Sequence, residues 1–292
     1  MAPASDSPTP RLPLEAWGRR LLAAAQARAD RSQVGRWAFE FLMFGIKQAW
    51  ACLFGGLMLA LLLGTFLFYP DGAPLARYDF LVIGAVAIQA AMLLLKLETW
   101  EEARVILVFH IVGTIMELFK TAAGSWIYPE PSLLRIGEVP LFSGFMYAAV
   151  GSYIARIWRI FDIRFSHYPP VWMTVVLATA IYVNFFAHHW VWDFRWLLFA
   201  ATALLFWRAR FHFTPDRERR WMPVLLGFLL VALFIWFAEN LGTLSRAWIY
   251  PDQADGWSPV SLAKLGSWFL LMIISVVLVS LVHRPEPEMT PK

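Results

Sequence analysis

Apolar stretches of about 20 residues alternate with short polar loops along most of this chain, a pattern that predicts membrane-crossing helices. Eight such spans are expected, at residues 48–69, 78–97, 103–122, 140–160, 171–188, 194–211, 222–242 and 261–282. The fifth and sixth are the shortest, so the loop that joins them, residues 188–195, is expected to be tight and close to the membrane surface.

The first 47 residues differ from the rest because charges interrupt them. Residues 1–13 are rich in Pro and Ser and predict a disordered start. Residues 12–29 predict an amphipathic helix on the inner membrane surface, with apolar side chains toward lipid and arginines toward headgroups. Residues 34–50 predict either a second interfacial helix or a solvated linker.

An internal repeat organises the apolar part. Glu117 is followed after eight residues by Trp-Ile-Tyr-Pro at 126–129, and Glu239 is followed after eight residues by the same motif at 248–251. The same spacing of 122 residues carries the first span onto the fifth and the fourth onto the eighth, while the second and sixth align after a shift. An even number of spans in each unit gives both units the same orientation.

The predicted fold is therefore an all-α integral membrane protein with eight transmembrane helices arranged as two parallel four-helix repeats, plus an N-terminal interfacial helix. Its predicted divisions are residues 1–47, 48–165, 166–283 and a short tail, 284–292.

Composition and charge strengthen the membrane assignment. The chain is 59% hydrophobic and 16% charged, whereas soluble domains carry about 25% charged residues. With the N-terminus inside, 19 of the 25 Lys and Arg residues fall on the inner side. The positive-inside rule then predicts a bacterial inner-membrane protein with both termini in the cytoplasm. Cys52 is the single cysteine, which excludes an internal disulfide framework.

Charged clusters at the inner side have ordinary explanations. Arg156, Arg159 and Arg164 are expected to form part of a basic face that attracts anionic lipid, so nucleic acid is not an expected partner. Glu98 and Glu102 belong to a short inner loop, residues 96–104, that is expected to be solvated.

Glu117 and Glu239 are the main candidates for chemistry, because each is predicted one to two helical turns inside the outer end of a span. Ionisable groups there usually face a bundle interior or a wet cavity. Two neighbouring buried carboxyl groups resist joint ionisation and could share acid and base roles. Alternatively each is structural, bonding a broken backbone segment or pairing with a base, for which Lys120 and Arg246 are candidates.

His110 lies two turns before Glu117 on one helical face, while its repeat partner is Ala232. His110 is expected either to relay a proton, in which case the first repeat alone carries the chemistry, or to form an ordinary interhelical hydrogen bond. Asn184, His188 and the adjacent His189 cluster with Asp193 at the outer end of the fifth span. Their spacing matches no standard metal motif, so no metal is assigned, and the cofactor is left open.

The repeated aromatic residues are candidates for substrate binding. Trp126, Tyr128, Trp248 and Tyr250, with Lys120, Asn184 and His188, would line an outer-leaflet site for an apolar lipid or isoprenoid. The alternative is that the aromatic motifs anchor the loops at the headgroup level.

Residues 47–56, the stretch from Phe109 to the first Trp-Ile-Tyr-Pro motif, and the second motif together resemble a bacterial membrane family, domain of unknown function 817. The resemblance covers residues 35–283 and implies a multi-spanning protein without assigned catalytic residues. Glu117, Gly124 and Tyr128, followed by Gly137-Glu138-Val139-Pro140, are also similar to the carotenoid-hydratase type of membrane protein. The second half lacks the Gly-x-Val-Pro part.

Three functions fit these features. A lipid- or isoprenoid-modifying enzyme would use Glu117, Glu239 and His110 and predicts a cavity that opens sideways to lipid. A proton- or cation-coupled transporter predicts a water path from His110 to the inner face. A non-catalytic scaffold predicts that Gln in place of either Glu changes stability alone. Phosphate-loop, Gly-x-Ser-x-Gly and dinucleotide signatures are absent from the sequence.

Overall fold

The computed structural model describes residues 13–188, 190–282 and 285–287, with the backbone alone for residues 13–19. Its helices are α1 (Pro13–Ala29), α2 (Gln33–Ala51), α3 (Leu53–Phe68), α4 (Arg77–Leu94), α5 (Trp100–Ala122), α6 (Phe142–Ile160), α7 (Val171–Ala187), α8 (Arg195–Phe206), α9 (Val224–Leu244) and α10 (Leu262–Val282), with a 3-10 turn at Pro251–Gln253. Five short strands, β1 (Arg135–Ile136), β2 (Val139–Pro140), β3 (Arg164–Ser166), β4 (Arg210–Phe213) and β5 (Arg220–Pro223), lie between helices.

The described chain is mostly helical and apolar, as the hydropathy pattern predicts. Four helices, α4, α5, α9 and α10, are long and apolar enough to cross a membrane, or five crossings exist if the bent pair α2–α3 counts as one. Helices α3 to α10 lie at the eight predicted positions. However, α8 has 12 residues, a length of about 18 Å against ~30 Å of hydrocarbon, so the eight-crossing arrangement stays a prediction.

The first predicted span contains a break that hydropathy does not reveal. Helix α2 ends at Ala51, α3 begins at Leu53, and the two axes differ by 64°. Helix α2 starts at Ser32, whose side chain accepts a hydrogen bond from the Gly35 amide. The expected helix at residues 34–50 is therefore confirmed as a helix, while its place at the membrane surface stays a prediction. Of the predicted surface helix 12–29, residue 12 lies outside the described part.

A three-stranded antiparallel sheet, ordered β3-β4-β5, closes one end of the molecule. It shortens two predicted spans, because Phe211 lies in β4 and Met222 lies in β5 instead of in helices. The reason is local: apolar and polar residues alternate in both segments, with a turn between them, which is a strand pattern. Glu286 and Pro287 join the edge at Phe165, and α1 reaches the β4–β5 turn through Gln26 and Asp216.

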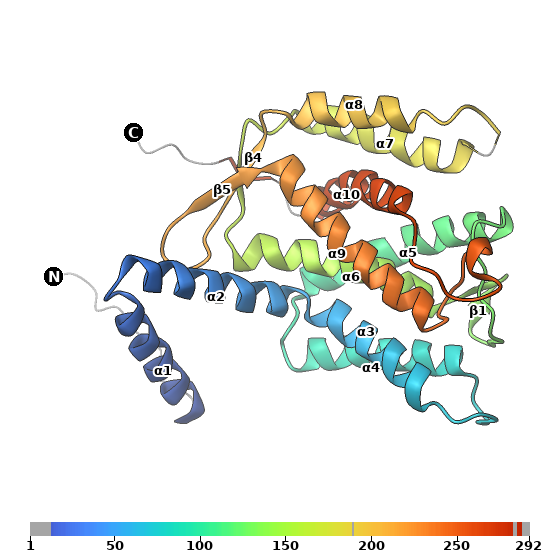
Figure 1. Ribbon diagram of the computed structural model, residues 1–292, viewed down its shortest axis with the longest axis horizontal. Helices are drawn as coiled ribbons and strands as arrows, with labels where there is room; N and C mark the ends of the chain where they lie inside the picture. The colour runs from blue at the N-terminus through green and yellow to red at the C-terminus, as the bar shows by residue number, and fades with distance from the viewer. Residues whose placement is uncertain (1–12, 189, 283–284, 288–292) are drawn as a thin grey trace.

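Most of the helices lie in two pairs at opposite edges with a central set between them (Figure 1). Helices α3 and α4 run side by side at one edge of the view, α7 and α8 run side by side at the opposite edge, and α5, α6, α9 and α10 lie between them. The sheet and α2 lie at one end of the long axis, and β1–β2 lies at the other. The sequence places the first end inside, so we call them the inner and outer ends.

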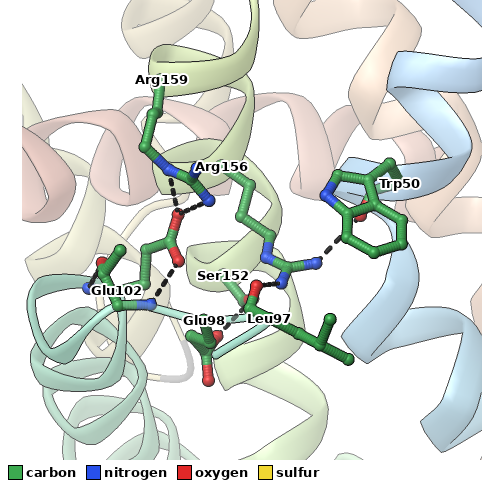
Figure 2. A network of polar contacts seen from close by, with 8 residues as sticks. Trp50, Leu97, Glu98, Glu102, Ser152, Arg156 and Arg159 are labelled. Atoms are coloured by element: carbon green, nitrogen blue, oxygen red, sulfur yellow. Dashed lines mark hydrogen bonds and ion pairs between the residues drawn. The ribbon is translucent and has the colours of Figure 1, made fainter. Parts of the chain in front are cut away.

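At the inner end, Glu98 and Glu102 of the loop expected to be solvated are instead buried near Arg156 (Figure 2). The Arg156 guanidinium is fully buried and donates to the carbonyl oxygens of Trp50, at 2.9 Å, and Leu97. Glu98 accepts a bond from Ser152 at 3.2 Å, and its carboxylate interacts electrostatically with Arg156. Burial raises the pKa of Glu98 above its ordinary value, although bonds from Gln89 and Ser152 oppose the shift.

Glu102 completes this network. Its carboxylate accepts from Arg159 at 3.1 Å and from the Thr99 amide at 2.8 Å, which caps α5. The expectation of a solvated loop was wrong for Glu98 and Glu102, while Lys96, Glu101 and Arg104 are exposed. Arg156 does not belong to an exposed basic face. Hydropathy counts charges, but it cannot tell a charge that meets water from one that binds helix ends.

At the outer end, Asp79 of α4 holds the loop that follows the first Trp-Ile-Tyr-Pro motif. Its buried carboxylate accepts bonds from the Ser132 hydroxyl at 2.7 Å and from the Leu133 and Leu134 amides at 2.9 and 2.7 Å. Arg77, two residues earlier, pairs with Glu130 at 3.1 Å. The start of α4 therefore fixes the position of residues 130–134.

Replacing Asp79 by Ala is expected to release this loop. Hydrogen bonds to a charged group contribute about 1.5–3 kcal/mol each, so the Leu133 and Leu134 amides should exchange hydrogen about 10- to 100-fold faster. Hydrogen–deuterium exchange on the purified protein measures this change. Asp71→Ala, which removes an exposed carboxylate of the neighbouring outer loop, is the control; equal exchange in both variants would contradict the role of Asp79.

Candidate functional site

The two Trp-Ile-Tyr-Pro motifs meet each other at the outer end. The Ile127 amide donates to the Ile249 carbonyl and the Ile249 amide donates to the Ile127 carbonyl, both at 3.0 Å. These residues occupy the same position in the two repeats, so the motifs pair antiparallel across a local two-fold relation. The rings of Trp126 and Tyr250 cross edge to face, with their centroids 6.1 Å apart.

Glu117 lies beneath the first motif and is buried, with 3% of its surface exposed. One carboxylate oxygen accepts from the Trp126 indole at 2.7 Å and from the Tyr128 hydroxyl at 2.6 Å. The other oxygen accepts from the Tyr147 hydroxyl of α6 at 2.6 Å. The nine- and eleven-residue spacings from Glu to Trp and Tyr thus bring two of the three donors to this carboxylate, and α6 supplies the third.

Glu239 occupies the matching place in the second half and is 4% exposed. It accepts from the Tyr250 hydroxyl, and its other oxygen accepts from the Trp268 indole of α10 at 2.6 Å. Trp248 instead packs against Gly242, where an added Cβ would lie 2.2 Å from its ring. Each carboxylate therefore accepts from the tyrosine of its own motif, Tyr128 for Glu117 and Tyr250 for Glu239. The other donors to the two carboxylates differ.

The two motif tyrosines are held as hydrogen-bond donors. Burial, strengthened by the neighbouring Glu117 and Glu239 carboxylates, raises the pKa of Tyr128 and Tyr250 well above the ordinary value. Both phenols keep their protons at neutral pH and can donate to the carboxylates.

A cavity of about 980 Å³ reaches both carboxylates. It runs from Phe41 and Phe213 at the inner end to Lys120 and Lys264 at the outer end, and side chains of both halves line it. Most of the lining is aliphatic or aromatic, so its volume suits a chain-like apolar molecule.

The cavity opens toward the side of the molecule. Phe41 of α2 and Phe234 of α9 line it, yet they expose 77% and 72% of their surfaces. The cavity therefore reaches the molecular surface at α2 and at α9. Phe234 lies in the predicted span 222–242, where that surface would face lipid.

The other predicted site residues separate into two groups. Asn184 and His188 line the outer part of the cavity, and Asn184 also accepts from the Phe194 amide at 2.9 Å and donates to Asp193 at 3.1 Å. Lys120 is buried there, with its ammonium 4.0 Å from the Phe185 ring centroid. His189 lies outside the described residues.

His110 does not line this cavity. It packs against Gly144 of α6, and its ring lies 4.6 Å from that of Phe145. The ring therefore packs between α5 and α6, and the interhelical hydrogen bond offered as the alternative stays a prediction. Within the described ranges, no group of three His, Cys, Asp or Glu residues could hold a metal ion.

Three residues of the site, Tyr147, Trp268 and Lys264, lie outside the repeated motif, so the repeat does not predict them. Tyr147 of α6 corresponds at the repeat spacing to Phe269, and Trp268 of α10 corresponds to Met146. Neither counterpart can donate a hydrogen bond from its side chain. Lys264, whose ammonium lies 3.9 Å from the Tyr250 ring centroid, corresponds in the same way to Phe142. Sequence reasoning could have found Tyr147 and Trp268 by asking which donors satisfy a buried carboxylate.

Fold and site together define a mostly helical membrane protein with an apolar cavity that ends at two buried carboxylates. The chain belongs to the family described as "Protein of unknown function (DUF817)", which matches residues 40–276. The family resemblance read from the sequence is therefore confirmed.

A bacterial relative covers most of the chain. It is the "Uncharacterized protein YoaT" of Bacillus subtilis (strain 168), 42% identical over 241 residues, which are 82% of this chain and 90% of YoaT. Two similar solved structures are of MvINS, an Insig homolog from Mycobacterium vanbaalenii, and of a cross-linked MvINS trimer. They share 14% identity, with TM-scores of 0.46 and 0.47, and cover 65% and 66% of this chain and 98% of MvINS. The likeness to the carotenoid-hydratase type stays a resemblance of motif.

Proposed function

We propose that this protein is a bacterial inner-membrane enzyme that modifies a lipid or isoprenoid by acid–base chemistry at Glu117 and Glu239. The observation that carries the proposal is the cavity: it is apolar along most of its length, it opens toward lipid, and both carboxylates line it. An apolar chain could enter sideways and place one end beside the two carboxylates.

The surroundings of the carboxylates support proton transfer. Tyr128 and Tyr147 donate to Glu117, and Tyr250 donates to Glu239. A substrate that displaces one of these donors would meet a carboxylate base or, through the phenol, a proton donor. The Trp126 and Trp248 rings also line this end of the cavity and would contact the apolar chain or a developing cation.

The orientation belongs to the same proposal. Eight crossings in two parallel repeats, with the sheet and both termini in the cytoplasm, place the carboxylates in the outer leaflet. The basic residues of the inner segments support this orientation. His110 would then contribute to helix packing, outside the reacting groups.

One observation favours transport as a second candidate, since the cavity extends over most of the distance between the inner and outer ends. A transporter for protons or cations needs polar side chains along that route. The route between Gln48 and Glu117 instead passes mostly aliphatic and aromatic groups. The geometry therefore supports an apolar ligand better than a small cation.

The test compares membrane lipids of cells that express wild type or the Glu117→Gln/Glu239→Gln double variant at equal levels. Gln keeps the size of each side chain but can neither take up nor release a proton under these conditions. A lipid species made or consumed only with wild type, read by untargeted mass spectrometry, is the expected result. It would also identify the substrate class.

Glu101→Gln/Glu138→Gln, which changes two exposed glutamates, is the matched control and should give the wild-type profile. The host is a bacterium whose own DUF817 gene has been deleted. Identical profiles in all three strains would reject the enzyme hypothesis. A profile lost in the control as well would show that the chemistry does not depend on the buried pair.

A further inference from the structure

Three cationic side chains gather where the cavity reaches the outer end. Lys120 of α5, Lys264 of α10 and Arg195 of α8 all line it. Lys264 and Arg195 lie close enough to Lys120 to interact with it electrostatically. Lys120 is 3% exposed, so a charged group has been placed inside the protein at the edge of an apolar space.

Three acidic groups also lie near this cluster and act on its cations. Asp193 acts electrostatically on Lys120, pairs with Arg195 at 3.2 Å and accepts from Asn184. Glu239 interacts with Lys264, but each of its oxygens accepts from an aromatic donor. Asp252 also acts on Lys264, and its side chain lies in an exposed turn.

Aromatic rings hold one of the cations in place. The Lys264 ammonium lies 3.9 Å from the Tyr250 ring centroid and 5.5 Å from that of Trp126, so both repeats contribute to its position. Cations over aromatic faces are stabilised without losing their charge. Lys264 therefore remains available to a second, anionic group on its cavity side.

We propose that the cluster of Lys120, Lys264 and Arg195 binds the anionic headgroup, a phosphate or a carboxylate, of a single-chain amphiphile whose apolar chain occupies the cavity. Lysine and arginine are the usual ligands of both anions. The cavity supplies the apolar half of the site, and the cation cluster supplies the polar half. This inference rests on the proposed function, because it names the substrate class of the same cavity.

The positions along α5 determine which part of the ligand would react. Lys120 lies three residues beyond Glu117, or about 4.5 Å further toward the outer end. A headgroup at Lys120 therefore brings the first few carbons of its chain beside Glu117 and Glu239. The chemistry would act next to the headgroup, not at the far end of the chain.

The experiment measures binding of radiolabelled probes to the full-length protein in nanodiscs of zwitterionic phosphatidylcholine. Two matched pairs are compared: farnesyl phosphate with farnesol, and palmitate with hexadecanol. In at least one pair the anion should bind more tightly, and the pair in which it does distinguishes a phosphate from a carboxylate. Lys120→Met and Lys264→Met should each weaken that anion about 10- to 100-fold, since hydrogen bonds to charged groups contribute about 1.5–3 kcal/mol, and should leave the alcohol unchanged.

Lys96→Met removes an exposed lysine of an inner loop and should bind both probes as wild type does. Lys120→Arg keeps the charge and should restore most of the affinity, which guards against a variant that simply fails to fold. Equal binding of anion and alcohol in both pairs, or anion binding that survives both lysine changes, overturns the proposal. The Glu117→Gln/Glu239→Gln variant separates the two hypotheses: if it binds the anion normally while lipid profiles never change, the headgroup site stands and the enzyme falls.

Discussion

Replacing Arg156 by Met should lower the free energy of unfolding by about 3–5 kcal/mol, the usual cost of removing one partner of a buried charge network. The fully buried guanidinium of Arg156 binds the carbonyl of Trp50, where α2 ends, and that of Leu97, after α4. Carbonyls at helix ends lack partners within their helix. Met fills similar volume but leaves both carbonyls without this donor, and it removes the positive charge that acts on the buried Glu98.

The loss can be followed by tryptophan fluorescence during titration of the detergent-solubilised protein with sodium dodecyl sulfate. Arg104→Met is the matched control, because Arg104 is exposed near the start of α5, at the same inner end of the molecule. This variant should change the free energy of unfolding by less than about 0.5 kcal/mol. Equal midpoints for the two variants would show that Arg156 does not join α2–α3 to the rest of the bundle.

Replacing Gly144 by Leu should cost about 3 kcal/mol or more, because it forces bulk into a close helix contact. An added Cβ at Gly144 would lie 2.4 Å from the His110 ring nitrogen and 2.7 Å from the Thr114 hydroxyl. Small residues let membrane helices approach closely in this way. Since Tyr147 is one turn further along α6, separation of α5 from α6 should also remove its bond to Glu117.

Gly64→Leu is the control for this change, since no atom outside its own helix lies within 4 Å of a Cβ added there. Both variants can be compared by thermal unfolding in detergent with size-exclusion chromatography of the heated samples. A Gly144→Leu protein as stable as Gly64→Leu would mean that α5 and α6 do not depend on this contact.

The sequence predicted the helical membrane class and the family, because long apolar runs have few other physical explanations. It also singled out Glu117 and Glu239, since a costly charge at a repeated position requires a reason. It was wrong about Glu98 and Glu102, two charges that read as solvated but are buried near Arg156. It also missed the break at Cys52 and the sheet. The local alternation in β4 and β5 was read as part of longer apolar runs, and β3 joins β4 from a segment far away in the chain.

The sequence by itself determined the apolar segments, the repeat spacing and the pairing of each Glu with a Trp-Ile-Tyr-Pro motif, because these are properties of order along the chain. Only the tertiary structure decided which side chains complete each carboxylate site, since Tyr147 and Trp268 come from other helices at positions that the repeat does not match. It also decided that Lys120 and Lys264 lie near each other. Their counterparts at the repeat spacing are Gly242 and Phe142, so packing of two unlike surfaces, rather than repetition, places both cations at one end of the cavity.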